Sequence, residues 1–420
     1  MVKINPLQFQ KVVKVESCSD LTTLKVPGAK PLKGFNVIFD DTILFPEGGG
    51  QNDDHGIIWN EDQDEGSAYQ VKRVVRKNGQ AVHFVLADKP FEKGVTMVQK
   101  IDWTRRFDHM QQHTGQHLIS SIFDKIGIET LSWWMAENEV DKVGVSYIEL
   151  DTKETCHEQL EHVEDECNQA IRDHLEVKTL VYAPGSEELQ NAKTRGLPDD
   201  HEGSIRVIKI GDIDQNMCCG THVSNLSQLQ MVKILYTEKK KNKFYLYFLV
   251  GSRVNQYLAQ CFKREKDLTS ILNGGPEHHG ELTDKAVKNC KKYQKCTQNL
   301  LKEMATLTAN QLKTTKPKFY SVHRPEMCND FINILLTQLG DQDIFILVTM
   351  GNDKEGPCQL AMSMNTPNGM EVLNSLGASV CEALEAKARA DPKTLRTNGK
   401  FLSLKNRDKA DKIIEQFFSV

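Results

Sequence analysis

The chain has 420 residues, of which 39% are hydrophobic and 26% are charged, and its formal net charge is −4. This length predicts two or three domains, and the composition excludes a disordered chain. The longest apolar run, residues 344–350, is far too short to cross a bilayer, so no membrane segment is expected. The first 21 residues lack the apolar core of a signal peptide, and eleven scattered cysteines, an odd number, indicate reduced thiols in the cytoplasm.

The first hundred residues predict a small β-barrel or sandwich made of short strands and turns. The expected strands span residues 35–39, 42–45, 69–75 and 81–86, and Asn78-Gly79 is a hairpin signal between the last two. A glycine-rich loop, residues 46–56, interrupts them. Its three consecutive glycines permit positive φ and close approach of the backbone to a ligand, although a simple turn explains them equally well.

The middle of the chain mixes helices and strands. Apolar residues recur at helical spacing over residues 107–125 and again over residues 156–175. Strands are expected at residues 204–210, 229–236 and 244–250, and the last two form a hairpin. The turn between them is rich in lysine: Lys239, Lys240, Lys241 and Lys243.

Beyond residue 252 the pattern predicts two antiparallel helices, at 254–272 and 287–312, followed by a small α/β unit. That unit has expected strands at 318–323, 344–350 and 359–364 and expected helices at 326–339, 370–386 and 406–417. The fold class is therefore α+β. We expect three parts: a β-barrel-like domain at 1–100, an α+β domain at 101–252, and a helical arm with a small α/β domain at 253–420.

The C-terminal helices offer two further predictions. Residues 285–316 hold eight lysines and one acid, which suits a polyanionic partner or simply a solvated helix face. The apolar stripe of Leu300, Met304 and Leu307 packs within the chain or against a second copy. We expect a monomer or a weak homodimer formed through these helices.

Two histidines share one face of the helix expected at 107–125. His113 and His117 are one turn apart, and this spacing lets both imidazoles bind one zinc ion. Such pairs also arise by chance. His109 and His113 form a second pair at the same spacing, and a core or surface histidine is the simpler interpretation of His109.

A second half of the pattern lies much later in the chain. Cys218 and His222 are four residues apart in a glycine-containing turn between strands. A His-His-Cys-His set of nitrogen and sulfur donors favours zinc over magnesium or calcium. The two halves together predict one zinc ion. Cys219 is an alternative thiol ligand, since it is only three residues before His222.

Several hydrolase classes are disfavoured. Thr114 follows His113 where the helical zinc motif of metallopeptidases carries its glutamate base. The sequence has no Gly-x-Ser-x-Gly nucleophile elbow, and no Lys-Ser/Thr phosphate-binding loop follows the glycine-rich segment.

Three segments occur in one order along the chain. They are residues 42–51 with Asp54 and Gly56, residues 113–118, and residues 218–223. Together they resemble the editing domain of alanyl-tRNA synthetase and its free-standing AlaX relatives, and the similarity extends to residues 248–253. Because the chain begins directly at the barrel-like region, we expect a stand-alone editing protein. Its C-terminal part is similar to that of longer AlaX forms but lacks the Gly-Gly-Gly-Arg signature, which puts tRNA binding by this tail in doubt.

This resemblance implies hydrolysis of the ester in tRNA(Ala) mischarged with serine, and sometimes with glycine. A synthetase pocket built for a methyl side chain cannot strongly reject an added hydroxyl, whereas a second pocket that binds the hydroxyl can reject the methyl. The resemblance makes 101–252 a zinc-binding editing domain. It implies that Thr42 reads the serine hydroxyl and that Gln51 positions the ester or the terminal adenosine with the backbone amides of Gly48, Gly49 and Gly50.

The zinc ligands implied by the resemblance are His113, His117, Cys218 and His222. If all four bind tightly, the site is closed and organises the pocket; if one stays loose, an open position holds water or polarises the carbonyl. The four lysines of residues 239–243 and those of 285–316 would contact the tRNA backbone. Two alternatives remain open: a structural-zinc protein-interaction module without catalysis, and a metallohydrolase of a small ester.

Overall fold

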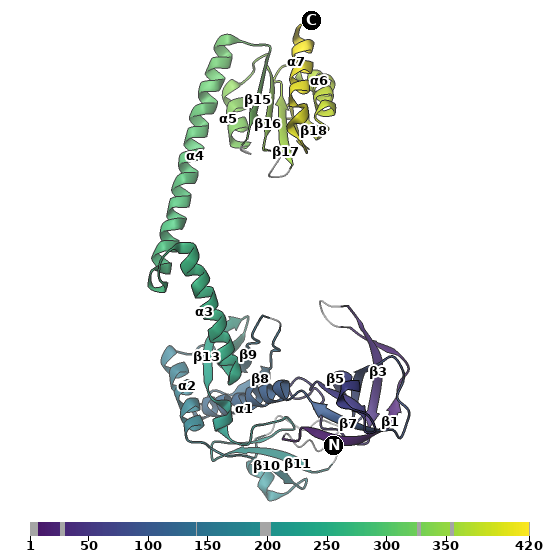
Figure 1. The fold of residues 1–420 in the computed structure, drawn as a ribbon. Helices are drawn as coiled ribbons and strands as arrows, with labels where there is room; N and C mark the ends of the chain where they lie inside the picture. Colours follow the sequence, from purple (N-terminus) through teal and green to yellow (C-terminus); the bar gives the residue numbers. More distant parts are fainter. Residues whose placement is uncertain are drawn as a thin grey trace. The chain divides into compact units, whose positions relative to one another are not determined.

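The computed structural model describes residues 7–25, 30–139, 141–193, 203–325, 329–352 and 357–419. The chain divides into two compact units, Met1–Asp267 and Leu268–Val420. Both contain helices and β-sheets, which confirms the mixed α+β class (Figure 1). The division into three parts at 100/101 and 252/253 stays a prediction.

The N-terminal part of the first unit is a closed, barrel-like sheet. Its strand order is β1-β7-β4-β5-β6-β3-β2, and β1 also pairs with β3, which closes the sheet. The expected hairpin is confirmed, because Asn78 and Gly79 both have positive φ in the turn between β5 and β6. The strands are β1 (Gln10–Cys18), β2 (Thr22–Leu24), β3 (Leu32–Phe39), β4 (Gly56–Asn60), β5 (Tyr69–Lys77), β6 (Gln80–Leu86) and β7 (Thr96–Ile101).

The strand expected at residues 42–45 is wrong, because this segment is a buried loop. Its apolar side chains enter the barrel core, yet its amides bond to side chains instead of a neighbouring strand. The N–H of Ile43 donates to Gln99 Oε1, and the N–H of Phe45 donates to Asp54 Oδ2. Hydrophobicity therefore indicated burial correctly but not the backbone conformation.

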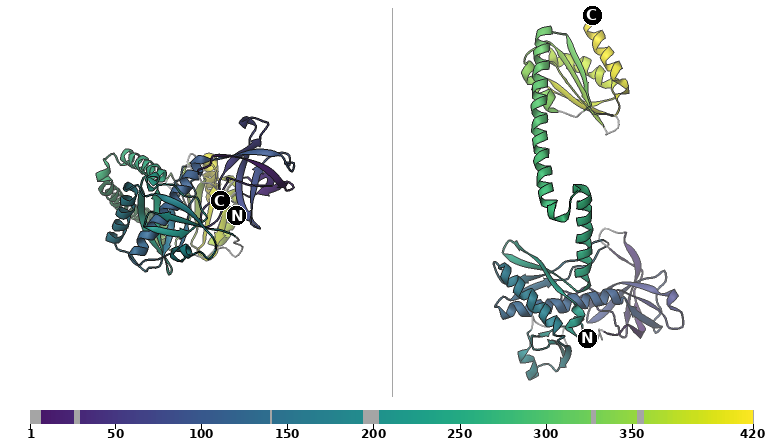
Figure 2. Two further views of the ribbon diagram at one scale, coloured as in Figure 1. Left: turned by 90° about the horizontal axis from the view of Figure 1, so that it is seen from below. Right: turned by 60° about the vertical axis from the view of Figure 1, so that its left-hand side comes forward.

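The rest of the first unit is built around the four-stranded antiparallel sheet β13-β14-β9-β8. Helices α1 and α2 pack on one face of it and share one hydrophobic core with its strands (Figures 1 and 2). A three-stranded sheet, β10-β11-β12, lies in the same unit. The elements are α1 (Trp103–Lys125), β8 (Thr130–Trp134), β9 (Ser146–Leu150), α2 (His157–Arg172), β10 (Val177–Tyr182), β11 (Ile205–Ile210), β12 (Asp214–Met217), β13 (Val232–Lys240), β14 (Lys243–Val250) and α3 (Ser252–Leu272).

Helix α1 is the central element of this unit. It begins four residues before the expected start, where the side chain of Asp102 caps it by accepting from Arg105 N. All residues from 109 to 123 are buried. Gly115 permits close packing against the sheet, since a Cβ there would lie 2.4 Å from Val250 Cγ2. A helix covered on every side is well suited to hold side chains rigidly.

The second unit is an α/β arrangement around the sheet β15-β16-β17-β19-β18, in which only β15 and β16 pair in parallel. The sequence pattern missed the hairpin of β18 and β19, which are short and largely exposed. The beginning of the helix expected at 326–339 lies outside the described residues. The elements are α4 (His279–Thr315), β15 (Phe319–Arg324), α5 (Asn329–Leu339), β16 (Phe345–Met350), β17 (Cys358–Ser363), α6 (Gly369–Ala383), β18 (Lys387–Asp391), β19 (Arg396–Phe401) and α7 (Arg407–Ser419).

Helix α4 packs through a different stripe from the one expected. Ala305, Ala309 and Leu312 are buried against α5, whereas Leu300 and Leu307 are 58% and 70% exposed. The antiparallel pairing of α3 with α4 and the oligomeric state both stay predictions. Among the described residues, no helix combines the length and hydropathy needed to cross a membrane.

Candidate metal centre

Two segments distant in sequence bring four ligand side chains together. His113 and His117 lie one turn apart on α1, and Cys218 and His222 lie on the loop after β12. One ligand atom from each lies within 4.8 Å of the others. The sequence predicted this set of four.

The distances among these atoms suit a tetrahedral metal. Cys218 Sγ lies 3.4 Å from His113 Nε2 and 3.3 Å from His222 Nε2. Bond lengths of about 2.0–2.1 Å to nitrogen and 2.3 Å to sulfur place neighbouring ligands of tetrahedral zinc about 3.5 Å apart. The donor set and its spacing therefore fit zinc.

Each histidine is held by a hydrogen bond at its other ring nitrogen. Gln51 Oε1 lies 2.8 Å from His113 Nδ1 and also accepts from the N–H of Thr221. Because this oxygen only accepts, His113 Nδ1 carries the proton and Nε2 keeps its lone pair for a metal. The amide of Gln51 also donates to Thr221 Oγ1 over 2.8 Å, which fixes its orientation.

Asp214 and Thr114 do the same for the other two rings. Asp214 Oδ2 lies 3.2 Å from His117 Nδ1, and Thr114 Oγ1 lies 3.1 Å from His222 Nδ1. Carboxylate, amide and hydroxyl partners of this kind orient histidine ligands in metal sites. All three rings thus direct Nε2 toward a common point.

The protonation states of the four ligand side chains follow from their burial and from the charges beside them. Burial raises the pKa of the Cys218 thiol, but the neighbouring His113 and His222 outweigh burial and leave that pKa well below its ordinary value. Burial also opposes charge on His117, yet the hydrogen bond to Asp214 raises its pKa to about 9. Burial and the neighbouring rings lower the pKa of His222. The site therefore presents a thiolate and the neutral imidazoles of His113 and His222, whereas His117 would release its proton when a metal binds.

The loop that carries the thiol is shaped around His113. A Cβ on Gly220 would lie 2.1 Å from His113 Cε1, so only glycine fits at that position. The guanidinium of Arg206 donates to the carbonyls of Cys218 and Gly220 over 2.8 and 2.6 Å. The sequence analysis missed Arg206, because no local motif links β11 to this loop.

The glycine-rich loop reaches the same centre. Gly48 and Gln51 exchange backbone hydrogen bonds across Gly49 and Gly50, which both have positive φ. The N–H groups of Gly49 and Gly50 donate to no acceptor within the described part of the chain. Of the three glycine amides expected to bind substrate, only these two are therefore available.

Trp133, which the sequence analysis missed, joins this loop to the metal ligands. Its indole donates to Gly49 O over 3.0 Å, and its ring lies 4.7 Å from that of His113. A Cβ on Gly50 would lie 2.5 Å from Trp133 Nε1. The half-buried indole thus forms a wall between the loop and His113.

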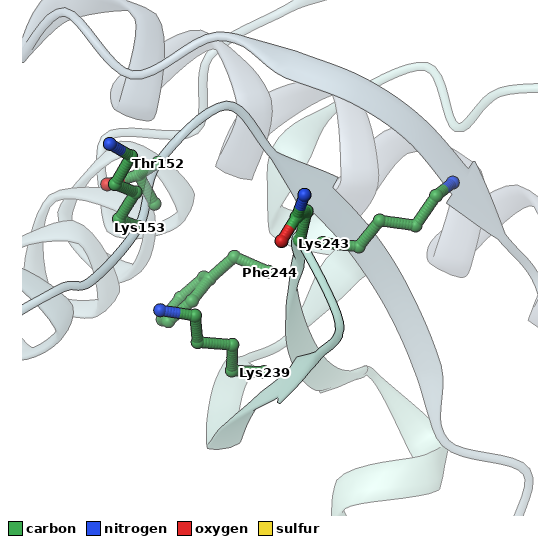
Figure 3. A pocket seen from close by; sticks show the side chains of 6 residues that line it. Thr152, Lys153, Lys239, Lys243 and Phe244 are labelled. Carbon is green, nitrogen blue, oxygen red and sulfur yellow. The ribbon is translucent and has the colours of Figure 1, made fainter.

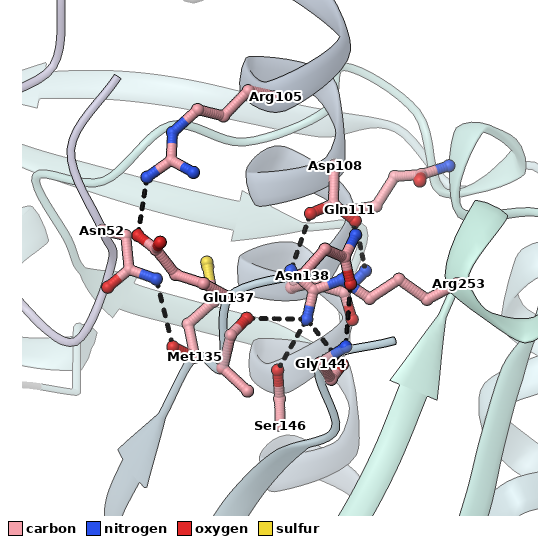
Figure 4. A network of polar contacts seen from close by, with 12 residues as sticks. Asn52, Arg105, Asp108, Gln111, Met135, Glu137, Asn138, Gly144, Ser146 and Arg253 are labelled. Atoms are coloured by element: carbon pink, nitrogen blue, oxygen red, sulfur yellow. Dashed lines mark hydrogen bonds and ion pairs between the residues drawn. The ribbon is translucent and has the colours of Figure 1, made fainter. Parts of the chain in front are cut away.

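A polar network fixes the segment between β8 and β9 (Figure 4). Arg253, at the start of α3, is fully buried; it pairs with Asp108 of α1 and donates to the carbonyls of Ala136 and Gly144 over 2.8 Å. Asn52 donates to Met135 O over 3.2 Å. The network connects the glycine-rich loop, α1 and α3 to the strand that carries Trp133.

A second ion pair joins the barrel to α1. Arg106 and Asp54 are both fully buried, and the guanidinium makes several contacts with the carboxylate as well as one with Ile43 O. Removing one partner of such a pair typically costs about 3–5 kcal/mol. Because Asp54 belongs to the glycine-rich loop, the pair fixes this loop relative to the helix that carries His113.

Thr42 lies in the barrel and makes no hydrogen bond to the four ligands among the described contacts. Its hydroxyl lies 2.9 Å from His83 Nε2 and 3.0 Å from Gln99 Oε1, and it accepts from Leu44 N. The structure thus brings Gln51 to the centre but leaves Thr42 in a separate polar cluster. Its expected role in reading the serine hydroxyl stays a proposal.

The lysine hairpin lies at the end of the sheet where β13 and β14 are joined. Lys239 and Lys243 line a pocket of about 360 Å³ with Lys153 and Phe244 (Figure 3). Lys243 and Val250, which packs on Gly115, are seven residues apart on β14, or about 23 Å at a rise of about 3.3 Å per residue. Contact of these lysines with a tRNA bound at the metal centre stays a prediction.

The two alternative ligands are not part of the set. Cys219 is exposed, and burial together with the neighbouring Cys218 raises the pKa of its thiol. His109 is buried beside Arg105, Arg106 and Arg253, and burial together with these cations lowers its pKa to about 2. His109 is therefore a neutral core histidine, as its simpler interpretation predicted.

The fold and the site define a class: a barrel-like sheet joined to an α+β domain that holds a three-histidine, one-cysteine centre. Residues 205–244 match the family model described as threonyl and alanyl tRNA synthetase second additional domain. The chain is 41% identical over 414 residues to alanyl-tRNA editing protein Aarsd1-B of Xenopus laevis, covering 97% of this chain and 95% of that protein. It is 40% identical over 412 residues to Aarsd1 of Mus musculus, with 96% and 94% covered.

A more distant relative is the putative alanyl-tRNA editing protein alaX of Saccharomyces cerevisiae, 33% identical over 301 residues, or 68% of this chain and 65% of that protein. The chain belongs to the family of alanyl-tRNA editing proteins. This confirms the resemblance seen in the three sequence segments.

Proposed function

We propose that this protein hydrolyses the ester that links serine to tRNA(Ala), with glycine as a second substrate, at a zinc site formed by His113, His117, Cys218 and His222. The convergence of these four donors, with the outer nitrogen of each histidine held by Gln51, Asp214 or Thr114, carries the proposal. Membership of the editing family supplies the substrate class. Zinc bound there would supply Lewis acidity in a tetrahedral site.

The glycine-rich loop would bind the ester. The unused N–H groups of Gly49 and Gly50 are fixed by the turn and by the indole of Trp133. Preorganised backbone donors of this kind stabilise the negative charge that develops on a carbonyl oxygen during acyl transfer. Gln51 acts differently, because both ends of its amide are occupied; it is a positioning residue for His113.

Selection of serine would depend on the cluster around Thr42. The buried Nε2 of Gln99 has no hydrogen-bond partner in the described part of the chain, so this cluster retains one unused donor. A substrate hydroxyl would satisfy that donor, whereas the methyl group of alanine would not. We expect Thr42→Val to reduce the preference for serine over alanine by about tenfold, measured as the ratio of kcat/KM values.

Lys239, Lys240, Lys241 and Lys243 would contact tRNA phosphates away from the ester. Binding should weaken as salt rises, because neutralised phosphates release counterions.

The deciding experiment measures release of serine from Ser-tRNA(Ala) by the wild type and by Cys218→Ala, with Ala-tRNA(Ala) and a free serine ester as further substrates. We expect wild-type hydrolysis of Ser-tRNA(Ala) alone and at least a hundredfold loss in the variant. Equal rates for both proteins, or no hydrolysis by wild type with zinc bound, would favour a structural-zinc interaction module. Equal hydrolysis of the free ester would identify a small-ester hydrolase.

A further inference from the structure

The face of the sheet β13-β14-β9-β8 opposite to α1 and α2 carries a row of aromatic side chains. On β14, Phe244, Leu246, Phe248 and Val250 belong to the core shared with the helices, so Tyr245 and Tyr247 point to the other face. Strand register places one aromatic residue on each strand of the row, since Tyr236 pairs with Tyr247, Tyr247 with Tyr147, and Tyr147 with Trp134.

The rings are in contact from Tyr236 to Tyr147, and the row is open to solvent at its ends. The rings of Tyr236 and Tyr247 stack with centroids 4.5 Å apart, and those of Tyr247 and Tyr147 are 5.6 Å apart. Tyr236 and Trp134 are 51% and 52% exposed. At about 4.8 Å between strands, the row is roughly 14 Å long. No core function requires four exposed or half-exposed aromatic rings in one line.

The surroundings of the row suit a polyanion. Two carboxylates lie on this face, and each is paired with a lysine: Glu149 with Lys243 over 3.1 Å and Glu238 with Lys240 over 2.8 Å. A pocket at the end of the sheet is lined by three lysines and no acid (Figure 3). Lys239 pairs with Phe244 and points to the helix-covered face, so of these lysines Lys243 is the one on the face of the row.

One end of the row lies on β8, the edge strand of the sheet. Trp134 follows Trp133 on β8 and points to the opposite face, and the ring of Trp133 lies 4.7 Å from that of His113. A strand of nucleotides lying along the row would therefore reach the glycine-rich loop by passing around β8. The hydrogen bonds from Arg253 in Figure 4 fix Ala136 and Gly144, which follow β8 in the sequence.

We propose that Tyr236, Tyr247, Tyr147 and Trp134 form a stacking platform for unpaired nucleotides of RNA. Four-stranded sheets with helices on one face and aromatic residues on the other stack two or three bases in this way, and stacking tolerates any base. The proposal rests on the proposed function in one respect: the unpaired nucleotides are those of the tRNA 3′ end, whose ester must reach the metal centre.

The test measures binding of a ten-nucleotide single-stranded RNA ending in ACCA, and of a blunt RNA duplex of equal length, at one salt concentration. The variants are Tyr147→Ala, Tyr247→Ala and Trp134→Ala. Each should bind the single strand about tenfold more weakly and the duplex with unchanged affinity. Tyr147→Phe should stay within twofold of wild type, and so should Tyr293→Ala, which alters an exposed tyrosine on α4. Circular dichroism and zinc content confirm that each variant is folded.

Wild-type affinity of all three alanine variants for the single strand would overturn the platform. The platform would also be overturned if the variants changed only the oligomeric state, measured by sedimentation. That result would assign this face to a protein partner. Neither RNA probe carries an amino acid, so these results do not depend on hydrolysis. Failure of the platform and failure of the proposed activity are therefore distinguishable.

Discussion

His113 and His83 are both fully buried histidines of the first unit, but their ring nitrogens are used differently. His83 Nδ1 lies 3.1 Å from Val37 O and its Nε2 lies 2.9 Å from Thr42 Oγ1, so both nitrogens have protein partners. At His113 only Nδ1 has a fixed partner, Gln51, and Nε2 faces the Cys218 thiol.

The comparison shows that burial does not make a histidine a ligand. The outer hydrogen bond of His113 leaves one lone pair directed at three other donors, whereas His83 is saturated and acts as a polar core residue. Four predictions separate the two clusters, beginning with the largest expected effect.

Cys218→Ala should abolish tight zinc binding, because the site loses its only thiolate and with it a negative charge among buried imidazoles. We expect a decrease in zinc affinity of at least a hundredfold, measured by competition with a chromogenic chelator. The matched control is Cys219→Ala, which removes the exposed neighbouring thiol. If Cys219→Ala lost zinc and Cys218→Ala did not, the ligand would be Cys219 and not Cys218.

Gly220→Ala should weaken zinc binding nearly as much without removing a ligand. The new methyl group would lie 2.1 Å from His113 Cε1, so either the ring or the loop must move. We expect a loss of about a hundredfold in zinc affinity. Gly66→Ala is the control, since a Cβ there meets no atom within 4 Å. Wild-type zinc affinity in Gly220→Ala would show that His113 is not held in this position.

Gln51→Ala should reduce zinc affinity by about 10–100-fold, because His113 loses the acceptor that fixes its proton on Nδ1. Gln51→Glu keeps an acceptor at this position and should recover part of the affinity. A variant that lost hydrolysis at unchanged zinc affinity would instead place Gln51 in direct contact with the ester.

His83→Gln should change the pH dependence of stability and leave zinc binding unchanged. Burial lowers the pKa of His83 to about 4, so between pH 6.5 and 4 the unfolded chain binds a proton that the folded chain does not. The free energy of unfolding therefore decreases as the pH is lowered through this window. Between pH 7 and pH 5, His83 accounts for about 2 kcal/mol of the decrease. Denaturation at both pH values should show a smaller fall in the variant, and an equal fall would contradict a neutral His83.

The sequence predicted the four candidate ligands that the structure brings together, because ligand chemistry leaves a local pattern. His113 with His117 and Cys218 with His222 are each spaced by four residues, and only a few residue types bind zinc. The partners that orient them leave no such pattern. Asp214 precedes Cys218 by four residues on a strand. The sequence analysis used Thr114 only to disfavour a metallopeptidase, because it stands where such an enzyme carries glutamate.

The fold was predictable where periodicity and turn signals agreed, as in the hairpin around Asn78 and Gly79 and in helix α2. Prediction failed at residues 42–45, where three apolar residues are buried in a loop whose amides bond to side chains of Gln99, Asp54 and Thr42. The bond from Ile43 to Gln99 joins residues 56 positions apart, so no local window contains it. Trp133 is a similar case, because its role depends on the position of Gly49.

X-ray absorption at the zinc edge of the purified protein tests the central claim most directly. The account predicts one zinc ion with three nitrogen ligands at about 2.0 Å and one sulfur ligand at about 2.3 Å. Two sulfur ligands, a mainly oxygen shell, or protein purified in zinc-containing buffer that holds no zinc would contradict it.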